Sequence, residues 1–216
     1  MSQPRRYLLT GASSGIGEAL AHQLASRGYD LVLASRRVDN LKALAAELSS
    51  KHGRKVVALP LDVTDYAAAQ AIVGQAAEAL GGLDGVIANS GIAMSSKVGK
   101  GHFDDDKRII ETNLTGAIAT LDAATALFRQ QGHGHLVALA SVAGKVGLPA
   151  NAGYSASKFG LIGYVRTLQA ELAGKPIHAT LLLPGFIDTP INRSMQKRPF
   201  VIDVQKGAAL IADHID

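Results

Sequence analysis

The chain contains no cysteine among its 216 residues, which excludes disulfides, thiolate metal sites and a cysteine nucleophile. It also lacks any apolar run approaching the roughly 20 residues that a membrane-spanning helix needs. The opening segment, MSQPRRYLLTG, leads directly into a strand-like stretch and has no long apolar region followed by a cleavage site. These absences lead us to expect a cytoplasmic protein that does not associate with membranes.

Proline is scarce, with 7 residues, whereas hydrophobic residues make up 47% of the chain, which is typical of a globular protein. The formal net charge is +4, but the basic residues occur as scattered pairs: Arg5-Arg6, Arg36-Arg37, Arg54-Lys55 and Lys197-Arg198. A nucleic-acid-binding face usually concentrates such residues on one element, so we expect no nucleic-acid partner. A few positive charges placed for an anionic cofactor explain the balance more simply.

Short, mostly apolar segments alternate with longer amphipathic ones along the chain, which is typical of buried strands separated by helices. The predicted strands are Tyr7-Leu9, Leu31-Ala34, Val56-Leu61, Gly85-Ala88, Leu136-Ala140 and Ile177-Leu183. The predicted helices are Gly15-Arg27, Asn40-His52, Tyr66-Leu80, Asp105-Gln131 and Ala152-Ala173. The alternation predicts one α/β domain over residues 1–216, a Rossmann-like, doubly wound parallel sheet sandwiched between helices.

The two longest loops follow predicted strands directly, Ser141-Gly153 after the fifth and Gly185-Val201 after the sixth. Ligands of open α/β sheets bind outside the carboxyl ends of the strands, so we expect Val142-Asn151 and Phe186-Phe200 to line a substrate cleft. Unless they pack the loops closed, several apolar side chains leave room there for an apolar compound: Val146, Leu148, Phe186, Ile187 and Met195.

The first predicted strand ends in a glycine-rich turn, Thr10-Gly11-Ala12-Ser13-Ser14-Gly15-Ile16-Gly17, and a helix follows at once. Such glycines permit a tight turn and a close approach of the backbone to a pyrophosphate, while the helix amino terminus offers unpaired N–H groups. Ordinary strand–helix connections can also be glycine-rich. The position of this turn at the first such junction of the series favours a dinucleotide site.

The end of the second predicted strand bears on which dinucleotide binds. An NAD site would place an acidic residue there for the ribose 2′-hydroxyl, but the chain reads Ser35-Arg36-Arg37. Guanidinium groups and a hydroxyl suit a 2′-phosphate, although both arginines could instead simply be solvated at the start of the next helix. The sequence favours NADP(H) over NAD(H).

Tyr154 and Lys158 lie four residues apart in a predicted helix and share one of its faces. A neighbouring ammonium lowers the pKa of a phenol from about 10 toward the range useful in acid–base catalysis, although surface Tyr–Lys pairs are also common.

Ser141, at the end of the fifth strand, can orient a substrate carbonyl or merely cap a turn. Asn113 lies inside a predicted helix, where an amide side chain is unfavourable. The ordinary explanation is a polar surface residue or a local kink in the helix.

Taken together, these motifs resemble the single-domain branch of the short-chain dehydrogenase/reductase family over nearly the whole chain. The family's TGxxxGxG turn matches Thr10 to Gly17, and its YxxxK motif matches Tyr154 and Lys158. Its remaining motifs match the acidic residue in LDVTD, the segment Ala88-Asn89-Ser90-Gly91, and the Pro184-Gly185 turn. The resemblance implies cofactor contacts from Thr10, Gly11, Ser13, Ser14, Gly15, Ile16, Gly17, Ser35, Arg36, Arg37, Asp62, Val63, Asn89, Ser90, Gly91, Tyr154, Lys158, Pro184, Gly185, Ile187 and Thr189.

The resemblance further implies a carbonyl reductase or alcohol dehydrogenase whose chemistry requires no metal. Ser141 would hold the substrate oxygen and Tyr154 would exchange a proton with it. Lys158 would bind the nicotinamide ribose and lower the pKa of Tyr154, and Asn113 would hold a water in a proton relay. Thr189 stands where family members often hold the nicotinamide carboxamide.

Two departures from the family pattern stand out. Ala88 and Ser90 replace the first Asn and the Ala of the family's NNAG motif. Relatives also usually continue beyond a helix resembling Asp203-Ile211 into a seventh strand, which we expect to be missing here. Many relatives form dimers or tetramers through their two long helices and that strand, so we expect a homodimer or homotetramer.

Two alternatives stay open at this point: a nucleotide-binding regulatory protein with the same fold, and a 3-oxoacyl-thioester reductase. The spacing of Tyr154 and Lys158 argues against an enoyl-thioester reductase, and an epimerase or dehydratase would need a larger substrate domain.

Overall fold

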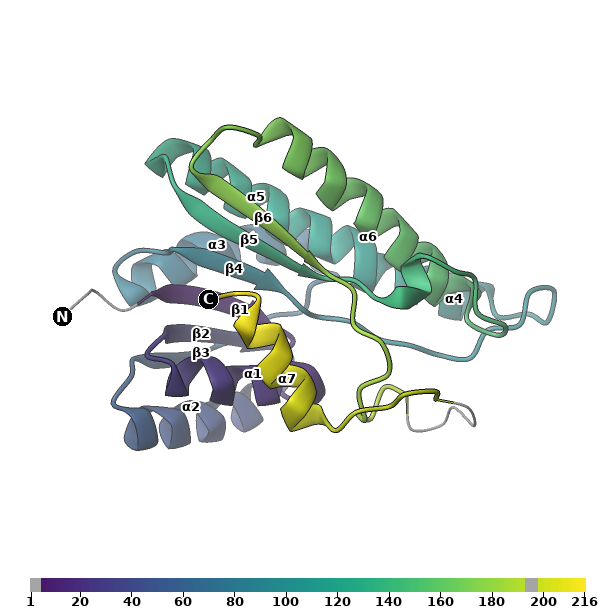
Figure 1. Cartoon of the computed structure of the whole chain (residues 1–216), viewed down its shortest axis with the longest axis horizontal. Helices are drawn as coiled ribbons and strands as arrows, with labels where there is room; N and C mark the ends of the chain where they lie inside the picture. The colour runs from purple at the N-terminus through teal and green to yellow at the C-terminus, as the bar shows by residue number, and fades with distance from the viewer. Residues whose placement is uncertain (1–4, 193–197) are drawn as a thin grey trace.

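The computed structural model describes residues 5–192 and 198–216. Its centre is a six-stranded parallel sheet in the order β3-β2-β1-β4-β5-β6 (Figure 1). The strands are β1 (Arg6–Thr10), β2 (Asp30–Ser35), β3 (Val56–Pro60), β4 (Gly85–Ala88), β5 (Gly134–Leu139) and β6 (Ile177–Leu182). The helices are α1 (Gly15–Ser26), α2 (Val38–His52), α3 (Tyr66–Leu80), α4 (Phe103–Ile110), α5 (Gly116–Gln131), α6 (Ala152–Glu171) and α7 (Val204–Asp213).

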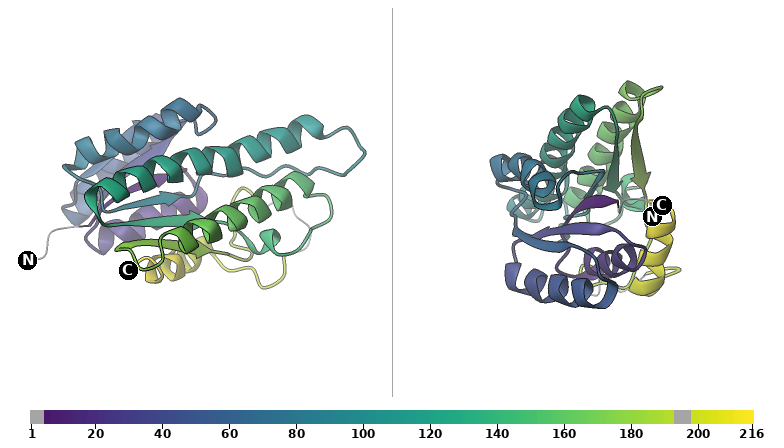
Figure 2. Two further views of the ribbon diagram at one scale, coloured as in Figure 1. Left: turned by 90° about the horizontal axis from the view of Figure 1, so that it is seen from above. Right: turned by 90° about the vertical axis from the view of Figure 1, so that its left-hand side faces the viewer.

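The predicted doubly wound fold is confirmed, with the helices arranged in layers on the two faces of the sheet. Figure 2 shows α1, α2 and α7 on one side and α3, α5 and α6 on the other. Side chains of β1 alternate between the two cores, since Leu8 packs toward α3 and α5 whereas Leu9 packs toward α1. Burial on both faces explains why the central strands read as continuous apolar runs.

The chain order of the strands reverses between β1 and β4, which are neighbours in the sheet. In such sheets the connections leave in opposite directions on either side of this point and open a crevice at the carboxyl ends of the strands. The fold therefore places the glycine-rich turn after β1 and the segment after β4 at the same crevice.

The predicted long helix Asp105-Gln131 is wrong in one respect, because it is interrupted. α4 ends at Ile110, a π-helical turn, η1 (Glu111–Thr115), follows, and α5 begins at Gly116. In η1 the Gly116 N–H bonds to the Glu111 carbonyl, a bond across five residues. Gly116 also packs closely against the segment that follows β3. A Cβ at position 116 would lie 2.5 Å from the Val63 carbonyl oxygen.

Within the described residues, no helix is both long and apolar enough to cross a bilayer.

One row of residues crosses the sheet near the amino ends of the strands. Tyr7, Gly85 and His135 are register partners on β1, β4 and β5. Because Gly85 has no side chain, the Tyr7 ring lies over β4, and a Cβ at Gly85 would overlap it. The Tyr7 hydroxyl lies 2.9 Å from His135 Nδ1, and Thr180 Oγ1 lies 2.8 Å from His135 Nε2. Burial lowers the pKa of His135 to about 4, so the imidazole is neutral at neutral pH.

This half-buried histidine predicts an acid-sensitive fold. The folded-state pKa of about 4 lies below the ordinary value of about 6.5, so the unfolded chain takes up the proton first as pH falls. The contribution of His135 to stability is complete above pH 6.5 and is lost between about 6.5 and 4, by up to about 3 kcal/mol. Urea unfolding of His135→Gln should show a smaller loss of stability over this pH interval than the wild type.

The matched control for this experiment is His214→Gln, which removes an exposed histidine that follows the end of α7, remote from His135. It should keep the wild-type dependence on pH. A His135→Gln variant whose stability falls with pH as steeply as the control contradicts the assignment.

Candidate nucleotide and active site

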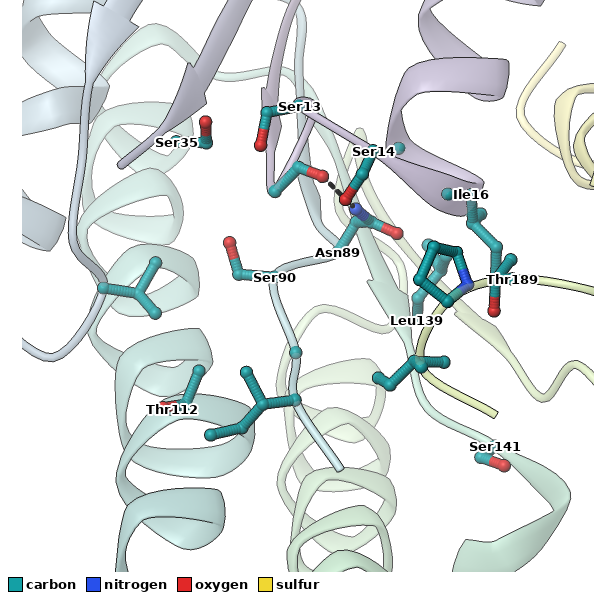
Figure 3. A pocket seen from close by; sticks show the side chains of 18 of the residues that line it. Ser13, Ser14, Ile16, Ser35, Asn89, Ser90, Thr112, Leu139, Ser141 and Thr189 are labelled. Carbon is teal, nitrogen blue, oxygen red and sulfur yellow. Dashed lines mark hydrogen bonds between the residues drawn. The ribbon is translucent and has the colours of Figure 1, made fainter. Parts of the chain in front are cut away.

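A cleft of about 550 Å³ lies at the carboxyl ends of the strands, at the crevice that the strand order predicts. It is lined by the glycine-rich turn, the ends of β2, β3, β4 and β5, the first two turns of α6, and the segment after β6. Figure 3 shows residues of these elements converging on it, among them Ser14, Ser35, Asn89, Ser141 and Thr189.

The glycine-rich turn has the geometry that a phosphate-binding turn needs. Gly11 has a φ of +68°, and a Cβ there would lie 2.8 Å from Ser90 Cα. A Cβ at Gly17 would overlap the Gly11 carbonyl oxygen and lie 2.6 Å from Asn89 Nδ2. The N-cap residue of α1, Ser14, makes no side-chain cap bond, so the first N–H groups of the helix are left for a ligand.

Thr10 and Asn89 fasten this turn to the end of β4. The Thr10 hydroxyl accepts hydrogen bonds from the Asn89 N–H at 3.1 Å and the Ser90 N–H at 3.2 Å. The Asn89 amide in return donates to the carbonyl oxygens of Thr10 at 2.9 Å and Gly11 at 3.2 Å. Thr10 is buried beneath the cleft and is the one predicted cofactor residue that does not line it, so its contact with a cofactor stays a prediction.

At the end of β2 the cleft is lined by Ser35, Arg36 and Arg37. Arg37 reaches over the glycine-rich turn and donates to Ser14 Oγ at 2.6 Å and Ser13 Oγ at 3.0 Å. The buried Ser35 hydroxyl has no hydrogen-bond partner among the described residues. This end of the cleft is therefore rich in donors, one of them unused.

Asp62 stands opposite Arg36, with 4.0 Å between Oδ2 and the Arg36 Nη1. Burial disfavours its charge, but the Thr64 N–H and hydroxyl hydrogen bonds, together with the Arg36 guanidinium, outweigh that cost. The pKa of Asp62 is consequently held below its usual range, and the carboxylate is ionised where it lines the cleft.

Ser141, Tyr154 and Lys158 lie at the other end of the cleft, as predicted. Ser141 precedes a short 3₁₀ turn, η2 (Val142–Gly144), and its hydroxyl accepts from the Ala143 N–H at 3.2 Å. Lys158 is 4% exposed, its Nζ donates to the Leu139 carbonyl at 2.8 Å, and burial lowers its pKa to about 8.

The effect predicted for Lys158 on Tyr154 is not what the structure shows. Burial raises the pKa of the Tyr154 phenol above its usual range, and a hydrogen bond with the Ser141 hydroxyl offsets this only in part. The Lys158 ammonium lies 5.7 Å from the centre of the Tyr154 ring and is directed to the Leu139 carbonyl. Ser141, rather than Lys158, is thus the neighbour that favours the phenolate here.

Asn113 lies in the π turn and is fully buried. Its amide accepts from the Ile92 N–H and donates to the Ile92 carbonyl, both at 2.8 Å, and it also donates to Ser157 Oγ at 3.3 Å. The Ser157 hydroxyl then donates to the Tyr154 carbonyl at 2.7 Å. The amide therefore joins the segment after β4 to α6, and the side chain does not line the cleft, whereas Thr112 does.

The predicted cleft walls are confirmed only in part. From the predicted wall Phe186-Phe200, the cleft is lined by Ile187, Thr189, Pro190, Ile191 and Asn192. Phe186 and the segment Val142–Asn151, with Val146 and Leu148, do not line it. Met195 lies outside the described residues. The sequence reasoning missed a further set of lining residues: Leu61, Ile92, Thr112, Leu139 and Ala140. Most of these residues are sequence neighbours of a motif residue, and this adjacency could have been used to predict them.

These features define an α/β nucleotide-binding protein with a Ser–Tyr–Lys group in its cleft. The short chain dehydrogenase family model matches residues 5–199, and the chain belongs to this family. It is 38% identical over 211 residues to an uncharacterized oxidoreductase of Mycobacterium tuberculosis, covering 96% of this chain and 83% of the relative.

Two further similarities have more specific names. A 2-dehydro-3-deoxy-L-rhamnonate dehydrogenase (NAD(+)) of Sphingomonas sp. is 38% identical over 188 residues, 87% of this chain and 74% of that protein. The structure of an alcohol dehydrogenase from the archaeon Thermococcus sibiricus, complexed with 5-hydroxy-NADP, superposes with a TM-score of 0.90 at 29% identity. That superposition covers 99% of this chain and 91% of the archaeal one.

Proposed function

We propose that this protein is an NADP(H)-dependent oxidoreductase that moves a hydride between the nicotinamide and a carbonyl or secondary alcohol of a small molecule. The observation that carries the proposal is the shared cleft, which holds the glycine-rich turn at one end and Ser141, Tyr154 and Lys158 at the other. A dinucleotide is an extended ligand, and a cleft with these two ends fits it.

The roles of the residues follow from their chemistry. When bound, the nicotinamide supplies or accepts the hydride. The raised pKa of Tyr154 keeps the phenol protonated at neutral pH, so Tyr154 can donate a proton to the substrate oxygen in the reducing direction. The Ser141 hydroxyl orients that oxygen. Lys158, whose ammonium donates to the Leu139 carbonyl, would hold ribose hydroxyls beside the tyrosine.

The role of Asn113 in holding a relay water stays a prediction, and we give its side-chain amide a second role. Both polar ends of its amide are occupied by Ile92, so we assign it to holding η1, the segment after β4 and α6 together.

The NADP(H) preference rests on the donors at the end of β2. A 2′-phosphate would accept hydrogen bonds from the unpartnered Ser35 hydroxyl and from the Arg36 and Arg37 guanidiniums. The archaeal structure was determined with an NADP derivative, whereas the Sphingomonas relative is named for NAD(+), so the choice needs a direct test.

Replacing Arg37 by alanine is expected to weaken NADPH binding by about 10- to 100-fold, the cost of losing a charge-assisted hydrogen bond. NADH, which lacks the 2′-phosphate, should lose less than about 3-fold because its other contacts persist. Nucleotide fluorescence titration measures both dissociation constants. Arg54→Ala, whose guanidinium bonds to the Gly53 carbonyl at 3.0 Å outside the cleft, is the control. Equal losses for the two nucleotides contradict the assignment.

Several of the side chains that line the cleft are apolar, among them Ile92, Leu139, Ile187 and Ile191. We therefore propose an apolar ketone or aldehyde as substrate. A panel of ketones, aldehydes, diketones and 3-oxoacyl thioesters, followed by NADPH absorbance, tests both the activity and the thioester alternative. Tight NADPH binding without turnover of any panel member supports a nucleotide-binding regulatory protein instead.

We further infer that the protein is a homodimer or homotetramer that assembles through α5 and α6, as the family resemblance suggests. These two helices form an outward groove lined by Asp122, Arg129, Tyr164 and Glu171, among others. Light scattering that gives the mass of a single chain contradicts this inference.

A further inference from the structure

The start of α6 determines where Tyr154 lies, since the tyrosine is the third residue of that helix. The first turn of any helix has N–H groups without intrahelical partners, and a side chain at the N-cap position usually satisfies one of them. The N-cap residue of α6, Asn151, makes no such bond. Its amide donates instead to the Pro149 carbonyl at 3.0 Å.

The missing cap comes from a different helix. Asp106, in α4, accepts a hydrogen bond from the Gly153 N–H at 2.9 Å between N and Oδ1. A carboxylate at this position also interacts favourably with the positive amino end of the α6 dipole. Figure 1 shows α4 beside the amino end of α6, and the two helices pack against each other.

Gly153 is the residue that allows this approach. A Cβ at position 153 would overlap Asp106 Oδ1 and lie 2.8 Å from Asp106 Cα. Any larger residue would therefore push α4 and α6 apart one position before the tyrosine.

A second tether acts just upstream of the helix. The Ser96 N–H donates to the Ala150 carbonyl at 2.8 Å, and Ser96 forms a parallel bridge with Asn151. Ala150 has a φ of +59°, a left-handed conformation that is uncommon for a residue with a side chain. Such conformations persist where the surroundings over-determine them, often near functional sites. The start of α6 is thus held from outside its own loop, by the segment after β4 and by α4.

We propose that Asp106 is a positioning residue for the proton-transfer step: by capping α6 at Gly153, it fixes the position of the Tyr154 phenol relative to Ser141. This inference rests on the proposed function. Asp106 does not line the cleft, so it acts through the helix and touches neither cofactor nor substrate.

Two substitutions at this position separate the hydrogen bond from the charge. Asp106→Ala removes the acceptor and is expected to lower kcat for NADPH-dependent carbonyl reduction by about 10- to 100-fold, since small misplacements of reacting groups have effects of this size. The KM for NADPH should change less than about 2-fold, because the glycine-rich turn and the end of β2 are remote from α4. Asp106→Asn keeps an acceptor oxygen and should retain kcat within about 3-fold of the wild type.

Asp104→Ala is the matched control, since it removes an exposed carboxylate from the same turn of α4. It should keep the wild-type kcat. Gly153→Ala disturbs the same contact from the α6 side and should reproduce the loss of kcat if Asp106→Ala does not fold. A kcat within about 2-fold of the wild type in folded Asp106→Ala, whatever its melting temperature, overturns the proposal.

Hydrogen exchange makes the test independent of turnover. Peptide amides covering residues 151–156 should exchange faster in Asp106→Ala than in Asp104→Ala, and Asp106→Asn should restore most of the protection. If the wild type turns over no substrate but this pattern appears, the proposed function fails and the capping of α6 stands. Unchanged exchange in Asp106→Ala overturns the capping itself.

Discussion

Tyr154→Phe is expected to lower kcat for carbonyl reduction by at least about 10³-fold, within the range that a positioned general acid contributes. The substitution removes the hydroxyl alone, so the ring still packs where the half-buried tyrosine does. The Kd for NADPH should change by less than about 3-fold, because Lys158 keeps its bond to the Leu139 carbonyl without the phenol. Stopped-flow absorbance of NADPH and fluorescence titration measure the two quantities on one preparation.

Tyr66→Phe makes the same chemical change at an exposed tyrosine at the start of α3 and should leave kcat unchanged. Turnover by Tyr154→Phe at the wild-type rate would falsify the assignment of Tyr154 as the acid. A parallel loss of NADPH binding would instead mean that the hydroxyl mainly holds the cofactor.

Gly17→Ala is expected to have the second large effect, the loss of nucleotide binding. The new Cβ would overlap the Gly11 carbonyl oxygen, which is backbone in a turn already fixed by Asn89. Relieving that overlap requires the turn to move away from α1, which also costs about 1–3 kcal/mol of stability, as overpacking does. The Kd for NADPH should rise by more than about 50-fold, since several phosphate-facing N–H groups shift together.

Gly74→Ala provides a control of opposite sign. Gly74 lies inside α3, and a Cβ there has no heavy atom within 4 Å. Alanine in an open helical position should stabilise the protein by about 0.5–1 kcal/mol and leave NADPH binding unchanged. Wild-type nucleotide affinity in Gly17→Ala contradicts the role given to the turn.

Local patterns in the sequence predicted the parallel sheet, the crevice and most of the cleft lining. The glycine-rich turn, Ser141, Tyr154 and Lys158 meet because each is tied to a strand end or helix start that the hydrophobic pattern already locates. Because the chain belongs to the family, these motifs can be recognised by their order along the chain.

Contacts between segments distant in sequence were not predictable in the same way. The π turn at Asn113 depends on the Ile92 backbone, 21 residues earlier, and Asp106 reaches Gly153, 47 residues later. The sequence does not explain why position 85 is glycine. In the structure the Tyr7 ring lies over this residue and leaves no room for a Cβ. The pKa of Tyr154 likewise depends on how deeply the phenol is buried, which the Tyr–Lys spacing does not reveal.

The central claim is that this cleft transfers a hydride with Tyr154 as its proton donor, and isotope transfer tests it most directly. NADPH carrying deuterium at the transferable C4 position should be incubated with the most reactive carbonyl of the panel, and the alcohol examined by mass spectrometry. The account predicts deuterium on the carbinol carbon with the wild type and almost none with Tyr154→Phe. Alcohol formed without the label, or equal labelling by the two proteins, contradicts it.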